Sequence, residues 1–215
     1  MHEPRYGVLL DTIRRLVLPE PRILDVGAAD EATLLRRLSG ATVDTLGFDD
    51  ERFPPGPGER HVRFDLKEAE RRDAWPELEP YDLVVCAEVI EHLPVAPQHV
   101  VAFLASALRP GGWLVLQTPN AARLANRVRL LAGKNPFEPL RPDSTSPGHF
   151  REYTVDELLD LARGAGLDVG GWLTANYFDT GTPANALLRR LGRAVPRRLR
   201  AGVTLWARKP RTLTP

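Results

Sequence analysis

The stretch Arg22-Ile-Leu-Asp-Val-Gly-Ala-Ala-Asp-Glu31 decides how the rest of the chain is read. An apolar run leads to Asp25, and Gly27 follows at the point where a tight turn would lie. An acidic residue then stands where it can cap a helix. The pattern predicts a strand, a turn and a helix N-terminus. In an α/β protein, a nucleotide-like ligand binds at such a turn.

The composition limits the class of protein. A chain of 215 residues suits one domain with a full hydrophobic core. The net charge of +1 gives no reason to expect nucleic acid or an anionic membrane as a partner. The single cysteine, Cys86, excludes an internal disulfide and fits a reducing compartment. No apolar run approaches the roughly 18 residues of a membrane span, so we expect a cytoplasmic protein without a transmembrane segment.

Apolar periodicity and turn residues predict alternating helices and strands. The expected helices cover residues 4–18, 31–38, 97–108, 121–131, 155–164 and 183–195. The expected strands cover residues 22–26, 42–49, 61–66, 81–87, 113–118, 167–174 and 203–207. This alternation predicts an α/β fold with a doubly wound, mostly parallel, seven-stranded sheet and helices on both faces. We expect one domain over residues 1–215, with 119–152 and 175–200 as lid or substrate-binding insertions.

Acidic residues stand at the ends of the first four predicted strands, at Asp25, Asp49-Asp50, Asp65 and Glu88. The carboxyl ends of parallel strands form the ligand-binding edge of such a sheet. A carboxylate at the second strand end suits a ribose diol, and an Asp at the third can accept from an adenine amino group. Acids beside the turn would repel a pyrophosphate. They suit a ligand with an ammonium group and a positive sulfur.

Five segments together resemble the class I S-adenosylmethionine (SAM) methyltransferases. In chain order they are Leu24-Asp-Val-Gly27, Gly47-Phe-Asp49, Asp65-Leu66, Glu88-Val-Ile-Glu-His-Leu93 and Leu108-Arg-Pro-Gly-Gly112. The resemblance implies a Rossmann-like methyltransferase fold with an antiparallel last strand, and SAM as the cofactor. The family's turn usually reads Asp-x-Gly-x-Gly-x-Gly, whereas Ala29 and Glu31 occupy the second and third glycine positions here.

The resemblance also implies which residues bind the cofactor. The end of the first strand would contact the methionine part of SAM, the end of the second strand its ribose, and the end of the third strand its adenine. The end of the fourth strand would form the floor of the cofactor site. At the second end Asp49 is preferred, with Asp50 as the alternative. The implied residues are Asp25, Gly27, Ala28, Asp49, Asp50, Asp65, Leu66, Cys86 and Ala87.

The segment after the fourth strand suggests a metal site. Glu88, Glu91 and His92 are spaced so that one helical turn would project them to one side. This cluster resembles that of ubiquinone-pathway O-methyltransferases and of small-RNA 2′-O-methyltransferases, and its oxygen ligands favour Mg²⁺ or Mn²⁺. His149 could be a further ligand. Equally, His92 or His149 could be a general base without metal, because the same sequence occurs across the superfamily where no metal is bound.

The acceptor is expected to be a small molecule. Four candidates for its pocket are Asn120, Phe150, Tyr177 and Phe178. We expect O-methylation of a hydroxyl on a phenol, sugar or secondary metabolite. The alternatives are a metal-dependent RNA 2′-O-methyltransferase and a non-catalytic SAM-binding subunit. We interpret the arginines between residues 189 and 200 as a solvated helix face rather than a docking surface for anions.

Overall fold

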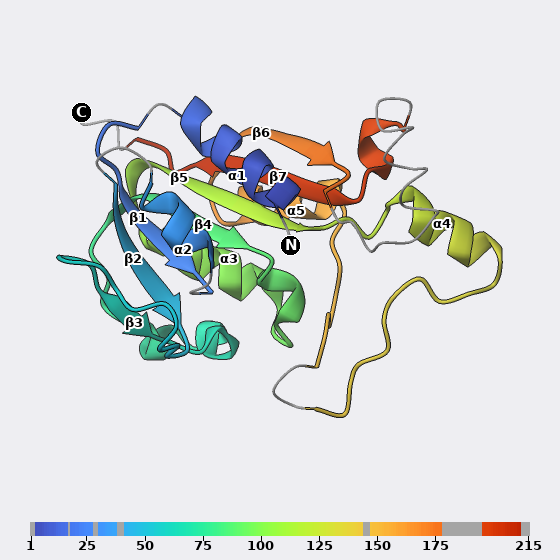
Figure 1. Cartoon of the computed structure of the whole chain (residues 1–215), viewed down its shortest axis with the longest axis horizontal. Helices are drawn as coiled ribbons and strands as arrows, with labels where there is room; N and C mark the ends of the chain where they lie inside the picture. Colours follow the sequence, from blue (N-terminus) through green and yellow to red (C-terminus); the bar gives the residue numbers. More distant parts are fainter. Residues whose placement is uncertain are drawn as a thin grey trace.

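The computed structural model describes residues 3–16, 18–27, 30–37, 41–143, 147–177 and 195–211. A seven-stranded sheet with the order β3-β2-β1-β4-β5-β7-β6 runs through the molecule (Figure 1). β1 to β5 pair in parallel, whereas β7 is antiparallel to both β5 and β6. The strands are β1 (Arg22–Val26), β2 (Thr42–Gly47), β3 (His61–Arg63), β4 (Tyr81–Ala87), β5 (Leu108–Pro119), β6 (Asp168–Ala175) and β7 (Gly202–Arg208). The predicted α/β class and the antiparallel last strand are therefore confirmed.

Helices cover both faces of the sheet (Figure 1). On one face, α1 (Glu3–Arg15) and α2 (Asp30–Leu35) contribute Leu9, Ile13 and Leu35 to one apolar cluster. On the other, α3 (Pro97–Ser106) and α5 (Val155–Gly164) contribute Phe103 and Leu158 to a larger one. Burial of both faces explains why β4, YDLVVCA, is apolar almost throughout.

The remaining helices are short. Four 3₁₀ helices are η1 (Leu66–Glu70), η2 (Arg72–Ala74), η3 (Ile90–His92) and η4 (Arg197–Leu199). Helix α4 (Leu124–Leu131) projects beyond the sheet, and the chain that follows it runs outward and returns to α5 (Figure 1). The predicted helix over 183–195 lies outside the described residues except for its last residue. No helix in the described part of the chain is both long and apolar enough to cross a membrane.

Two strand boundaries differ from the prediction by three residues or more. The sequence predicts a strand beginning at residue 113, but β5 begins at Leu108 and passes through Pro110-Gly-Gly with a shift in its pairing to β4. Gly112 makes this passage feasible, because a Cβ there would lie 2.8 Å from the Tyr81 carbonyl oxygen. β3 ends at Arg63, before Asp65, since the Asp65 side chain accepts from the Lys67 amide (3.0 Å) and caps η1.

The predicted start of α5 is confirmed in detail. Thr154 Oγ1 accepts from the Glu157 amide (3.3 Å), and the Glu157 carboxylate accepts from the Thr154 amide (2.8 Å). This reciprocal pair is the capping box that the sequence indicates. It fixes the point at which the chain returns from the long excursion after α4.

Candidate active site

A cavity of about 430 Å³ opens at the carboxyl ends of β1, β4 and β5. Its walls come from these strand ends, from α1 and α2, and from the segment between β5 and α5. The lining residues are Arg5, Asp25, Val26, Gly27, Glu31, Ala87, Glu88, Val89, His92, Pro119, Arg123, Glu138, His149 and Glu152. The cavity therefore lies at the sheet edge where the sequence places a ligand.

The turn after β1 requires glycine at Gly27. Its φ is +112°, and a Cβ at this position would lie 2.7 Å from Cγ2 of Val89. Its amide donates to the Leu46 carbonyl (2.9 Å), which holds the turn against β2. A ligand in the cavity therefore meets bare backbone at this point. Ala28 and Ala29 lie outside the described residues.

Asp25 is a buried carboxylate at the end of β1. It is 2% exposed, lines the cavity, and its Oδ2 has no hydrogen-bond partner in the part of the chain that the structure describes. Burial, reinforced by the neighbouring Glu31 charge, raises the pKa of Asp25 well above its ordinary value. An unpaired buried acceptor on a cavity wall is suited to a cationic or N–H group of a ligand.

The two candidates at the end of β2 have different surroundings. Asp49 has a side chain that is 63% exposed and lies 3.5 Å from Nε2 of His61 and 3.3 Å from Nη1 of Arg63. Asp50 is held by Arg52 through several contacts, the shortest of 2.6 Å. These bonds lower the pKa of Asp50 to about 2. Both carboxylates thus have basic neighbours, and Asp50 is held by the shorter contacts.

The remaining cofactor candidates divide between the cavity wall and the core. Ala87 lines the cavity, and Leu66 is buried at the start of η1 beside its cap, Asp65. The Cys86 side chain packs in the larger apolar cluster, where burial raises the pKa of its thiol. Cys86, Asp65 and Asp49 are not among the described residues that line the cavity.

Glu88 does not share a helical turn with Glu91 and His92. Its φ is +56°, and only Ile90–His92 form a single 3₁₀ turn after it. The Glu88 carboxylate points toward Arg5 instead, with 3.9 Å between Oε2 and Nη1. Burial and the neighbouring Glu91 raise the pKa of Glu88 far above its usual range. The strained backbone at Glu88 is thus the reason that its side chain does not project to the same side as Glu91 and His92, as the sequence predicts.

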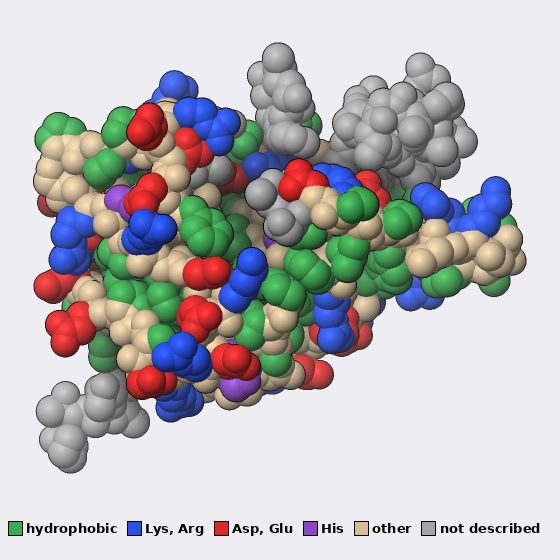
Figure 2. Space-filling view, turned by 90° about the horizontal axis from the view of Figure 1, so that it is seen from below, with side chains coloured by type: hydrophobic (Ala, Val, Ile, Leu, Met, Phe, Trp, Pro, Cys, Tyr) green, Lys and Arg blue, Asp and Glu red, His purple; other side chains and the backbone are tan. Residues whose placement is uncertain are grey.

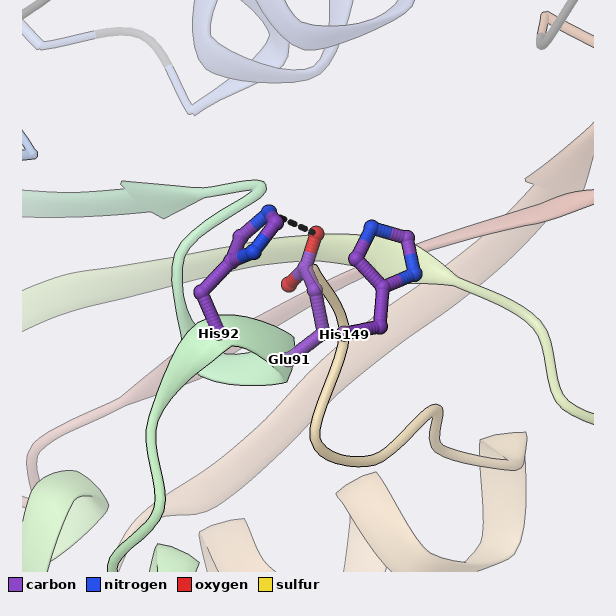
Figure 3. A group of neighbouring side chains, drawn as sticks. All are labelled: Glu91, His92 and His149. Atoms are coloured by element: carbon purple, nitrogen blue, oxygen red, sulfur yellow. Dashed lines mark ion pairs between the residues drawn. The ribbon is translucent and has the colours of Figure 1, made fainter. Parts of the chain in front are cut away.

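Glu91, His92 and His149 form the cluster that the fold assembles. One potential ligand atom from each lies within 4.8 Å of the others. The two imidazoles flank the Glu91 carboxylate (Figure 3), with ring centroids 4.7 Å apart. Glu91 is fully buried, its Oε2 accepts from Thr118 Oγ1 (2.9 Å), and its Oε1 lacks a hydrogen-bond partner among the residues that the structure describes. His92 Nε2 lies 4.0 Å from that Oε1.

The two histidines have opposite electrostatic surroundings. Burial lowers the pKa of His92, and its Nδ1 lies 3.0 Å from the Gly148 carbonyl oxygen. Because a carbonyl only accepts, this contact assigns the proton to Nδ1 and leaves Nε2 with its lone pair. The hydrogen bond with Glu152 raises the pKa of His149, whose Nδ1 lies 3.5 Å from Oε1 of that residue.

The three described candidates for the acceptor pocket, Asn120, Phe150 and Tyr177, do not line the cavity. Asn120 is buried and donates to the carbonyls of Arg198 (3.0 Å) and Arg200 (2.8 Å), so it anchors the segment before β7. Tyr177 is buried with its hydroxyl donating to the Val203 carbonyl (3.2 Å). Phe150 is 38% exposed, and Phe178 lies outside the described residues.

Several cavity residues were not singled out in the sequence, notably Arg5, Glu31 and Glu152. The expected helix over 4–18 is predicted only as a cover for the sheet, yet Arg5 of α1 lies on the cavity wall. Glu31 is noted only as a replaced glycine. Glu152 follows His149 by three residues, a spacing that could have drawn attention to the pair.

Sequence comparison identifies the family of this chain. The sequence model of the methyltransferase-domain family matches residues 1–170, so the chain belongs to that family. It is 29% identical over 159 residues to a ubiquinone biosynthesis O-methyltransferase of Burkholderia thailandensis. That alignment covers 71% of this chain and 66% of the relative, slightly less than two thirds of its length.

Solved structures share the fold at low sequence identity. A SAM-dependent methyltransferase from Archaeoglobus fulgidus superposes with a TM-score of 0.63 at 16% identity, covering 97% of this chain and 95% of that one. The 1,6-didemethyltoxoflavin-N1-methyltransferase of Burkholderia thailandensis, solved with S-adenosylhomocysteine, superposes with a TM-score of 0.56 at 18% identity. That match covers 97% of this chain and 78% of the other.

Proposed function

We propose that the protein transfers the methyl group of SAM to a hydroxyl oxygen of a small molecule. The observation that carries the proposal is that His92 and His149, which flank the buried Glu91 carboxylate, line the cavity that also contains Asp25 and Gly27. A methyl donor at the β1 turn would then lie beside groups that can remove a hydroxyl proton. The similarity to ubiquinone biosynthesis O-methyltransferases supports oxygen as the accepting atom.

In the proposed reaction, the acceptor oxygen attacks the methyl carbon of SAM. The carbon–oxygen bond forms as the carbon–sulfur bond breaks, and the sulfur leaves as the neutral thioether of S-adenosylhomocysteine. The hydroxyl proton must go to a base. His92 is suited to accept it, because its lowered pKa keeps the ring neutral and Nε2 carries the lone pair.

The cluster also fits a divalent ion. One carboxylate and two imidazoles offer ligand atoms within 4.8 Å of one another, and Glu91 Oε1 is buried without a hydrogen-bond partner. We propose Glu91, His92 and His149 as the residues that would hold Mg²⁺ or Mn²⁺, with Glu88 outside the set. Such an ion would supply Lewis acidity that lowers the pKa of the acceptor hydroxyl.

The methionine end of SAM would lie near Asp25 and Arg5. Arg5 lies on the cavity wall, with Glu31 at 2.6 Å. A carboxylate is recognised best by a guanidinium, so we propose that Arg5 binds the carboxylate of SAM. The ribose and adenine would extend toward Asp49 and Asp65, away from the described cavity walls.

The segment 119–152 would provide the acceptor side of the cavity within a single domain over residues 1–215. Arg123, Glu138, His149 and Glu152 come from this segment and line the wall that faces the cluster. We propose 175–200 as the second lid segment. The protein would act in the cytoplasm, where a free buried thiol such as Cys86 stays reduced.

An RNA substrate is less well supported. On the face shown in Figure 2, acidic and basic side chains are interspersed rather than separated by sign. The net charge of +1 also gives little attraction for phosphates. Nitrogen is the more serious alternative to oxygen, since a neighbour with the same fold is named an N1-methyltransferase.

The proposal is tested by measuring S-adenosylhomocysteine formation with matched phenol and aniline acceptors. We expect turnover with hydroxyl acceptors and its loss in His92→Ala. His99→Ala is the control, since His99 is exposed on α3. Turnover of amines alone would contradict the oxygen assignment. Activity that persists fully in chelator would assign the cluster to general-base chemistry rather than to metal binding.

A further inference from the structure

A buried ion pair joins the N-terminal helix to the helix after the cofactor turn. Arg5 of α1 and Glu31 of α2 lie 2.6 Å apart between Nη2 and Oε1, and their side chains are only 13% and 6% exposed. Both line the cavity. The pair is therefore part of the site wall and not a surface contact between helices.

The contacts of Arg5 with the described residues leave part of its guanidinium without an acceptor. Nη2 donates to Glu31 and to the Tyr6 hydroxyl (3.0 Å), and Nη1 lies 3.9 Å from the Glu88 carboxylate. Nε is buried and has no hydrogen-bond partner among the described residues. A buried donor without a partner is costly unless a ligand supplies the acceptor.

A carboxylate at Glu31 is electrostatically unfavourable at this position. It adds a third carboxylate beside Asp25 and Glu88, and its charge helps to raise the pKa of both. The cost is offset only if the Glu31 carboxylate holds Arg5 in a defined orientation. A long arginine on the first turns of a helix otherwise samples many rotamers, and fixing it in advance removes that entropy from the binding step.

We propose that Glu31 is a positioning residue for the amino-acid end of SAM. The salt bridge from Glu31 holds the guanidinium of Arg5, and with it helix α1, over the cavity. The remaining N–H groups of Arg5 then meet the carboxylate of the ligand. The acid itself contributes negative charge where the ligand carries its ammonium group. This inference rests on the proposed placement of SAM and adds to it the role of a residue that replaces a glycine of the family's turn.

Two ligands separate this role from a general structural effect. S-adenosylhomocysteine carries the amino-acid end, whereas 5′-methylthioadenosine has the same adenosine and sulfur without it. Calorimetry should show that Glu31→Gln weakens binding of S-adenosylhomocysteine at least about tenfold, or ~1.4 kcal/mol, and changes that of methylthioadenosine little. Glu31→Asp, which keeps the carboxylate, should recover part of the loss and serves if the glutamine variant is unstable.

Glu59→Gln is the matched control, since Glu59 forms a short, partly buried pair with Arg36 (2.8 Å) away from the cavity. It should leave both affinities unchanged. Equal weakening of both ligands by Glu31→Gln, or unchanged or tighter binding of S-adenosylhomocysteine, would overturn the inference. A wild-type chain that binds neither ligand would instead overturn the assignment of the cavity to SAM, so the two failures are distinguishable.

Discussion

The ring of His149 lies edge-on to the ring of His92, with 4.7 Å between their centroids and an interplanar angle of 77°. The two residues come from separate segments, one following β4 and the other preceding α5. The backbone hydrogen bond from the Phe150 amide to the Glu91 carbonyl (2.8 Å) and the side-chain hydrogen bond from His92 Nδ1 to the Gly148 carbonyl (3.0 Å) hold the segments together. Hydrogen bonds between these two loops thus bring the residues of the cluster together.

Removing His149 should weaken metal binding if the cluster holds an ion. We expect His149→Ala to lower the affinity for Mn²⁺ by ~10–100-fold, because one of three ligands is lost. Calorimetric titration of Mn²⁺ into the ligand-free protein measures this directly. His99→Ala should bind Mn²⁺ as the wild type does. Wild-type protein that takes up no Mn²⁺ would rule out the metal assignment and leave the general-base role.

The two carboxylates after β2 should differ in their importance for the cofactor. Asp49→Ala should weaken S-adenosylhomocysteine binding by about tenfold or more, since two hydroxyl contacts to a charged acceptor are lost. Asp50→Ala should have a small effect, because Asp50 is already occupied by Arg52. Binding measurements on both variants test the assignment. The reverse order of effects would identify Asp50 as the ribose ligand.

Asp25 should lower the stability of the ligand-free protein near neutral pH. Its pKa in the folded chain is raised above the ordinary 3.8, so the folded state binds the proton more tightly than the unfolded chain. Binding of that proton stabilises the fold fully at a pH below the pKa of Asp25 in the unfolded chain. This stabilisation is lost as the pH rises through the pKa of Asp25 in the folded chain. Asp25→Asn should therefore be more stable by about 1–3 kcal/mol near pH 8, the cost of an unpaired buried group.

Urea unfolding of the ligand-free protein at about pH 5 and about pH 8 measures this effect. The stability that Asp25→Asn gains over the wild type should grow with pH. The same variant should bind SAM more weakly than the wild type. Asp73→Asn is the control, since the Asp73 side chain is 78% exposed and its removal should change stability little at either pH. A variant less stable than the wild type at the higher pH would show that the Asp25 charge is compensated.

Gly27→Ala should impair both folding and cofactor binding. The added Cβ would lie 2.7 Å from Val89 Cγ2, and alanine disfavours the φ of +112°. We expect a loss of about 1–3 kcal/mol, measured by thermal unfolding, with weaker binding of S-adenosylhomocysteine. Val89→Ala in the same chain should relieve the contact but not the backbone strain. Complete rescue by Val89→Ala would show that the contact alone requires glycine.

Local patterns predicted the strands and the acids at their ends well. β1 and β4 begin and end where the apolar runs do, and α5 begins at Val155, the first residue of the predicted helix. These features depend on side-chain periodicity and on contacts between residues close in sequence. The passage of β5 through Pro110-Gly-Gly was missed, because pairing with β4 overrides the turn signal of those residues.

The sequence by itself determined the class of fold and the edge of the sheet at which the acidic residues and the cavity lie. Only the tertiary structure decided which titratable groups act together. It separated Glu88 from Glu91 through a left-handed backbone, joined His149 to His92, and brought Arg5 of the first helix to Glu31. The physical reason is that periodicity specifies which face a residue occupies, whereas contacts between distant segments depend on how loops and helices pack around the cavity.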